Sequence, residues 1–173
     1  MSCQRAFSWH DTGDKMIRLL KKIFLCFCTW LLLSCSQQGS VLHDTNGNPI
    51  SVSQLHGKWI IINYWATWCD SCVQEISELN HFYQHNQDKN IVLYGVNYDH
   101  MPMKDLQAAI ARTHIAYPVV LEDPAKTWAL GEFDALPVTF IIGPNGEVVK
   151  KFLGKSTEKS LLATIRELQK NYS

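Results

Sequence analysis

The sequence has no excess of either charge. Its 16 basic and 16 acidic residues give a formal net charge of zero. The first 34 residues hold five of the basic and two of the acidic residues, which leaves 11 basic and 14 acidic residues, a net charge of −3, in the remainder. Proteins that bind nucleic acid carry a basic surface. The charge distribution therefore argues against nucleic-acid binding.

The sequence also lacks an apolar run long enough to span a membrane comfortably. Its longest run, residues 23–33, falls well short of the about 20 apolar residues that a spanning helix needs. Arg18, Lys21 and Lys22 precede this run, and a basic region followed by a short apolar core is typical of a secretory signal. We therefore expect residues 1–34 to be a signal peptide.

The end of the apolar run indicates a signal of the lipoprotein type. Leu32-Leu33-Ser34-Cys35 resembles the bacterial lipoprotein box, in which cleavage before the cysteine leaves it lipidated. Residues 35–40 then form a short polar tether. Met16 is a more natural start than Met1, because the residues between them are polar. The alternative is an uncleaved membrane anchor, which the short apolar run disfavours.

Few cysteines remain once this leader is set aside. Of the six in the sequence, four lie in the leader or at the lipidation site: Cys3, Cys26, Cys28 and Cys35. Cys69 and Cys72 then remain as thiols. An exported domain with one thiol pair and no structural disulfide fits an enzyme that works in an oxidising compartment without scrambling its own bonds.

The two remaining cysteines form a Cys-x-x-Cys motif between a predicted strand and a predicted helix. Residues 59–65 are nearly all β-branched or aromatic, as in a strand buried on both faces. After the motif, apolar residues recur at helical spacing: Val73, Ile76, Leu79 and Phe82. The start of a helix stabilises a thiolate, and two intervening residues let the sulfurs bridge. We expect Cys69 to be the exposed attacking thiol and Cys72 the deeper, resolving one.

Two other interpretations of the motif are weaker. Half of a zinc site needs a second Cys-x-x-Cys or a Cys/His pair at ligand spacing, and the sequence lacks one. His81 and His85 stand four apart on the predicted helix, but no third ligand is evident. A purely structural disulfide would close too small a loop to stabilise the fold much. We expect no metal, and no cofactor beyond the redox-active cysteine pair.

The remaining elements predict a single α/β domain at residues 41–173 with a central mixed sheet flanked by helices. An N-terminal β-hairpin turns at Asn46-Gly47. Further strands are expected at 90–97, 117–121, 138–142 and 147–152, the last an edge strand. Helices are expected from Pro102, at 124–130 and at 157–171, with a helical turn at 53–58.

Residues 41–173 resemble the thioredoxin superfamily, specifically its membrane-tethered TlpA/ResA/DsbE branch. The matching stretches are Asn-Tyr-Trp-Ala-Thr-Trp-Cys-Asp-Ser-Cys at 63–72, Tyr-Gly-Val-Asn at 94–97, Tyr-Pro-Val-Val-Leu at 117–121, Ala-Leu-Pro-Val-Thr-Phe at 135–140 and Gly-Pro-Asn-Gly at 143–146. The resemblance implies a thioredoxin-like fold and thiol-disulfide oxidoreductase activity at Cys69 and Cys72.

The resemblance also implies a substrate-binding wall. Pro137 matches the cis-proline that faces the cysteines in this fold, and a cis X-Pro bond costs only about 0.5–1 kcal/mol. Leu136 would then offer its backbone N–H and C=O to an extended peptide lying across Cys69. A trans proline that opens a strand is the alternative. We expect Trp68 to form an apolar lid on the rim of the site.

Three polar residues near the cysteines carry further expectations. Glu75 matches an acidic residue of the ResA-like subgroup and, near Cys72, would raise the thiol pKa values and accept a proton, unless it is only a helix-dipole partner. Asn63 stands where cytosolic thioredoxins place a buried aspartate, as is common in this branch. Asp70 disfavours a thiolate at Cys69, which predicts a potential nearer the roughly −270 mV of thioredoxin than the −120 mV of DsbA.

As a member of this branch, the protein is expected to be exported and anchored on the periplasmic or extracytoplasmic side of the membrane. It would reduce disulfides in other exported proteins, such as apocytochrome c during cytochrome c maturation, with a membrane electron donor of the DsbD/CcdA type. Two alternatives remain open: an oxidase or isomerase of the DsbA or DsbC type, and a thioredoxin-fold escort module that uses its thiols as a switch.

Overall fold

The computed structural model describes residues 40–86, 89–170 and 172. The predicted signal peptide at 1–34, the start at Met16, the lipidation site Cys35 and the tether up to residue 39 lie outside this range. Gly39–Ser173 forms a compact unit by itself. Within the described ranges, no helix combines the length and the apolar character needed to cross a membrane.

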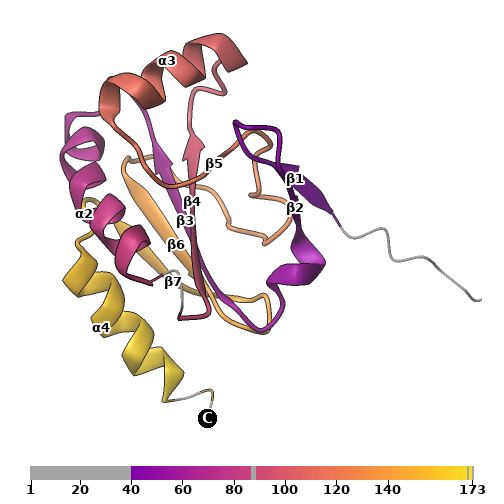
Figure 1. The fold of residues 1–173 in the computed structure, drawn as a ribbon. Coiled ribbons are helices and arrows are strands. Elements are labelled where there is room, and N and C mark those ends of the chain that lie inside the picture. The colour runs from indigo at the N-terminus through magenta and orange to yellow at the C-terminus, as the bar shows by residue number, and fades with distance from the viewer. Residues whose placement is uncertain (1–39, 87–88, 171, 173) are drawn as a thin grey trace, which may run out of the picture. The chain divides into compact units, whose positions relative to one another are not determined.

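A mixed sheet with the strand order β5-β4-β3-β6-β7 forms the centre of the described region (Figure 1). Its strands are β3 (Trp59–Trp65), β4 (Ile91–Asn97), β5 (Val119–Val120), β6 (Val138–Ile142) and β7 (Val148–Leu153). The central strand, β3, pairs in parallel with β4 and antiparallel with β6. Every residue of β3 is buried, as its nearly continuous run of β-branched and aromatic residues predicts, and the buried set includes the polar Asn63. The edge position of β7 is also confirmed.

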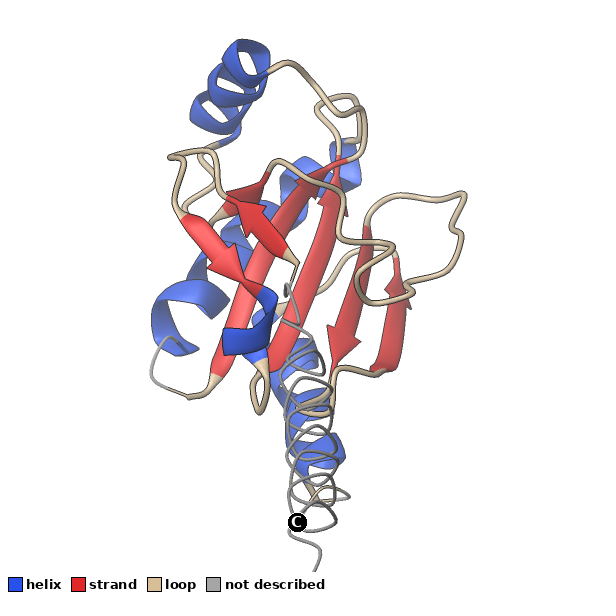
Figure 2. Cartoon of the chain, turned by 90° about the vertical axis from the view of Figure 1, so that its right-hand side faces the viewer, coloured by secondary structure: helices blue, strands red, loops and turns tan. Residues whose placement is uncertain are grey.

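Alternate residues of β3 enter two separate cores. One core holds Ile61 and Trp65 and is covered by the α-helices of the described region. These are α2 (Asp70–Asn86), α3 (Met103–Thr113) and α4 (Glu158–Gln169). The other core holds Ile60 and Ile62. Figure 2 views the sheet from the side of this second core, with helices behind the strands.

The predicted N-terminal hairpin covers the second core. Its strands β1 (Val41–His43) and β2 (Pro49–Ser51) pair antiparallel, and a short 3-10 helix, η1 (Val52–Leu55), follows. Leu42 and Leu55 are buried in this core together with Trp128. The hairpin is therefore an extension that packs on the sheet.

Two details of the sequence interpretation are wrong. Residues 124–129 form turns rather than a helix. Helix nucleation costs free energy that a stretch this short does not recover in hydrogen bonds, and the turns bury Trp128 and Leu130. Val73, which the apolar repeat groups with the buried Ile76, Leu79 and Phe82, is 40% exposed, whereas Glu75 is buried. The buried face of α2 is thus turned toward Glu75.

Candidate active site

The junction of β3 and α2 positions the cysteine pair. The backbone N–H of Cys69 donates to the carbonyl of Ala66 at 3.3 Å, just beyond the end of β3. The carbonyl of Cys69 accepts from the N–H of Val73 at 3.1 Å, so this residue closes the first turn of α2. A buried strand and a helix start, both predicted from local sequence, therefore fix the backbone on either side of the motif.

Cys69 and Cys72 form a disulfide, with their Cα atoms 5.2 Å apart. Cys69 keeps 7% of its surface exposed and Cys72 none. The predicted order of depth is therefore confirmed, but the expectation of an exposed Cys69 is wrong, because the residue is mostly buried. Of the two cysteines, Cys69 is the one that keeps some surface exposed to a substrate.

Two polar groups lie next to the Cys69 sulfur. The backbone N–H of Cys72 donates to Sγ of Cys69 at 3.2 Å, and the Ser71 hydroxyl oxygen lies 3.4 Å from the same Sγ. Donors at a helix start stabilise negative charge on sulfur. The arrangement can thus stabilise a thiolate at Cys69 once the disulfide opens.

Glu75 lies one helical turn beyond Cys72, inside the protein. Its carboxyl group is held between two donors: the Asn63 side-chain amide reaches Oε1 at 2.8 Å, and the Ser156 backbone N–H reaches Oε2 at 2.7 Å. Burial raises the pKa of Glu75 from its ordinary 4.5 to about 7, although these hydrogen bonds and the charge of Lys155 oppose the shift. The alternative role of Glu75 as a helix-dipole partner at the protein surface does not fit, because the residue is only 1% exposed.

Asn63 connects Glu75 to a wider buried network. Its Nδ2 also donates to the Thr139 hydroxyl at 3.0 Å, and its Oδ1 accepts from the Tyr117 hydroxyl at 3.4 Å. Sequence reasoning singled out Asn63 and Glu75 but missed Thr139, Tyr117 and Ser156. These three come from distant parts of the chain, so no local pattern could have indicated them.

The Leu136–Pro137 peptide bond is cis, as predicted. Because Tyr64 pairs with Val138 in the antiparallel β3–β6 ladder, Pro137 lies at the same end of the sheet as the start of α2. Leu136 packs against the core that contains both cysteines. In the described part of the chain, neither its N–H nor its C=O takes part in a backbone hydrogen bond. Both groups are available to a partner.

Trp68 stands on the rim of the site with 63% of its surface exposed. Its indole Nε1 donates to both carboxylate oxygens of Asp99, at 3.0 and 3.1 Å, and its ring meets that of Tyr98 edge-on at 6.4 Å. Asp99 and Tyr98 were also missed, although both directly follow β4, whose end adjoins the end of β3. These contacts orient a large apolar surface beside Cys69.

The expectation that His81 and His85 lack a third ligand is wrong. The carboxylate of Glu158, at the first residue of α4, lies beside them, and one ligand atom from each of the three residues falls within 4.8 Å of the others. Glu158 is far away in sequence and comes close because α4 packs along α2. This cluster is separate from the cysteine pair.

Comparison with known proteins agrees with this geometry. The model of the AhpC/TSA family matches residues 37–151. The thiol-disulfide oxidoreductase ResA of Bacillus subtilis is 32% identical over 121 residues, which cover 70% of this chain and 67% of that protein.

Solved structures show the same fold at lower identity. The chain aligns with StoA of Bacillus subtilis at a TM-score of 0.60 and 22% identity, covering 70% of this chain and 92% of that one. It aligns with a secreted Mycobacterium tuberculosis disulfide oxidoreductase homologous to E. coli DsbE at a TM-score of 0.58 and 14% identity, covering 74% and 95%. The chain therefore belongs to the AhpC/TSA family of thioredoxin-like proteins, as a thiol-disulfide oxidoreductase of the ResA type.

Proposed function

We propose that this oxidoreductase is exported and works as a reductant of disulfides in other exported proteins. The observation that carries the proposal is the position of Cys72 one turn before Glu75, a buried carboxyl group with a pKa of about 7. Such a group can be ionised while the thiols are reduced and take up the Cys72 proton as they are oxidised.

The reaction transfers two electrons from the dithiol to the substrate. The Cys69 thiolate attacks one sulfur of a substrate disulfide, and the other substrate sulfur leaves as a thiolate and is protonated. Cys72 then loses its proton, and its thiolate attacks Sγ of Cys69 in the mixed disulfide. The second substrate thiol is released and the Cys69–Cys72 disulfide forms.

Glu75 serves the second step. Cys72 is fully buried in the oxidised protein. Its proton must therefore pass to a base inside the protein rather than directly to solvent. Because helix positions three apart share a face, the Glu75 carboxylate lies on the side of α2 that Cys72 faces. It accepts the Cys72 proton as the resolving thiolate forms, and its pKa near 7 suits that exchange at neutral pH.

The substrate docks as an extended segment across Cys69. Leu136 offers its free backbone N–H and C=O to that segment, Pro137 shapes the wall, and Trp68 covers the segment with its exposed indole. Main-chain hydrogen bonds of this kind bind peptides with little regard to sequence. This mode suits an enzyme that acts on more than one exported protein.

The proposed direction needs an electron source outside the chain. A membrane dithiol donor of the DsbD/CcdA type would reduce the Cys69–Cys72 disulfide after each turnover, and apocytochrome c is the proposed substrate in cytochrome c maturation. The basic region, short apolar run and lipoprotein-like box ending at Cys35 support export and lipid anchoring. Intact-mass analysis of the membrane-extracted protein tests the anchor, because an attached leader contradicts it.

A reductase assay on insulin tests the activity. Wild-type protein with a dithiol donor should precipitate insulin chains, while the Cys69→Ser variant should be inactive. The Cys72→Ser variant should accumulate mixed disulfides that mass spectrometry identifies. Stable partner binding without turnover supports the escort module instead, and net oxidation of reduced substrates supports an oxidase.

A further inference from the structure

Two histidines and a glutamate gather where α2 and α4 pack together, away from the cysteines. His81 and His85 lie on successive turns of α2, and Glu158 is the first residue of α4. At 1.5 Å per residue, His85 lies roughly 20 Å along the helix from Cys72. The cluster is therefore a separate feature that the redox chemistry does not use.

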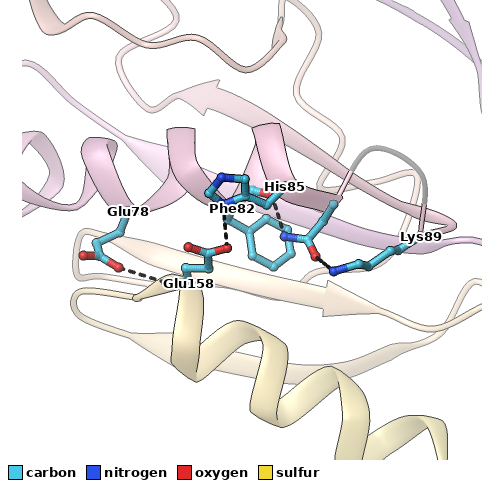
Figure 3. A network of polar contacts seen from close by, with 6 residues as sticks. Glu78, Phe82, His85, Lys89 and Glu158 are labelled. Atoms are coloured by element: carbon cyan, nitrogen blue, oxygen red, sulfur yellow. Dashed lines mark hydrogen bonds and ion pairs between the residues drawn. The ribbon is translucent and has the colours of Figure 1, made fainter.

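The three side chains are already oriented toward one another. The rings of His81 and His85 have centroids 5.9 Å apart, and Nδ1 of His85 lies 3.2 Å from Oε1 of Glu158. Figure 3 shows the His85 ring above the Glu158 carboxylate, with one on each helix. A pair of imidazoles four residues apart on a helix can bind one ion from the same face.

The backbone of Glu158 is fixed independently of its side chain. Thr157 caps α4 in a reciprocal capping box with Ser160. The Glu158 backbone N–H donates to Oε2 of Glu78 on α2 at 3.1 Å (Figure 3). The carboxylate therefore starts from an anchored helix end, which reduces the entropy lost when it binds an ion.

We propose that His81, His85 and Glu158 form a binding site for Zn²⁺ or a divalent transition-metal ion of similar preference. Two imidazoles and one carboxylate are ligands that Zn²⁺ takes in proteins, and water can fill the fourth position. Ligand atoms around a tetrahedral Zn²⁺ lie roughly 3.4 Å apart, so the present separations of up to 4.8 Å must shorten. Both imidazoles are exposed and can rotate to do so.

The donor set also disfavours Mg²⁺ and Ca²⁺. Mg²⁺ and Ca²⁺ prefer sites built of oxygen ligands, and a site with two nitrogens and one carboxylate suits them poorly. A bound Zn²⁺ joins α2 to α4, two helices that are distant in sequence. Since the complete ligand set exists only in the folded chain, ion binding stabilises the fold.

Zn²⁺ titration of the oxidised full chain tests the site, because Cys69 and Cys72 cannot act as ligands while they form a disulfide. Affinity is measured by competition with a chromophoric chelator. The variants are His81→Gln, His85→Gln and Glu158→Gln, with His56→Gln at another exposed histidine as the matched control. Ligands elsewhere in the chain are common to all variants, so differences between them report this site.

Wild type and His56→Gln should each bind one Zn²⁺ with similar affinity. Each of the three site variants should bind this ion at least tenfold more weakly. The melting temperature should rise with Zn²⁺ in the first two proteins only, and Mg²⁺ should have no such effect. Circular dichroism establishes that the variants are folded. Wild-type affinity in any one of the three site variants, or equal stabilisation by Mg²⁺, overturns the proposal.

Discussion

The side-chain amide of Asn63 donates a 2.8 Å hydrogen bond to Oε1 of Glu75, with both residues buried. The bond joins the central strand β3 to the helix that carries the cysteines. It holds a carboxyl group next to the turn occupied by Cys72, where burial raises the pKa of Glu75 to about 7. Several measurable consequences depend on this pair.

The first consequence is a dependence of stability on pH. The Glu75 pKa is about 7 in the folded protein against an ordinary value of 4.5, so the folded state holds the proton more tightly than the unfolded state. This contribution is fully present below pH 4.5 and is lost as the pH rises through 7, by about 3 kcal/mol at most. Denaturant unfolding of the oxidised wild type should show this decline between pH 5 and 8.

The Glu75→Gln variant should lack this part of the decline and be about 1–3 kcal/mol more stable than wild type at pH 8. Glu132→Gln is the matched control, since Glu132 is exposed, and it should keep the wild-type profile. An identical pH profile in wild type and Glu75→Gln means that the carboxyl group does not titrate in this range.

The second consequence concerns the thiols. An ionised Glu75 close to Cys72 disfavours a second negative charge there. The Glu75→Gln variant should therefore lower the pKa of the pair by about one unit. Thiolate absorbance at 240 nm in the reduced protein measures it, and an unchanged titration dismisses the proton-accepting role of Glu75.

Asn63→Asp should turn a favourable buried contact into a repulsive one. The substitution replaces the donor to Glu75 and Thr139 with a second carboxyl group. At pH 8 the unfolding free energy should fall by about 3 kcal/mol, and by less at pH 5, where the two carboxyl groups can share a proton. Denaturant unfolding at both pH values checks this; an equal loss at pH 5 and pH 8 contradicts the electrostatic explanation.

Trp68→Ala should impair docking without weakening the fold. The indole is mostly exposed, so stability should change by less than about 0.5 kcal/mol. Removing an aromatic anchor should lower kcat/KM for a protein disulfide by about tenfold, while the rate with oxidised glutathione stays near wild type. Val148→Ala, an exposed apolar residue at the far end of β7, serves as the control. Equal losses on both substrates indicate damage to the thiols rather than lost docking.

The structure shows which parts of the fold local sequence could predict. β3 and the start of α2 were predictable because a run of mostly β-branched and aromatic residues and an apolar repeat are local signals. The turns at 124–129 were not, because the burial of Trp128 and Leu130 overrode a weak helical pattern. Sequence periodicity cannot weigh a tertiary contact of this kind.

The same limit applies to the site. The motif predicted the pairing of Cys69 with Cys72, and the resemblance predicted the cis bond at Pro137. The environment of Glu75, however, depends on Ser156, which is 81 positions away. The ligand cluster depends on Glu158, 73 positions from His85. Pairs that meet only through helix packing leave no mark in the spacing of either residue.

The reduction potential of the Cys69–Cys72 couple shows whether the pair removes disulfides or installs them. Equilibration of the Cys69–Cys72 couple with glutathione buffers, followed by thiol alkylation, gives the value. A pair that removes disulfides should have a potential nearer the roughly −270 mV of thioredoxin than the −120 mV of DsbA. A value above roughly −170 mV, toward the oxidants on the same scale, contradicts it.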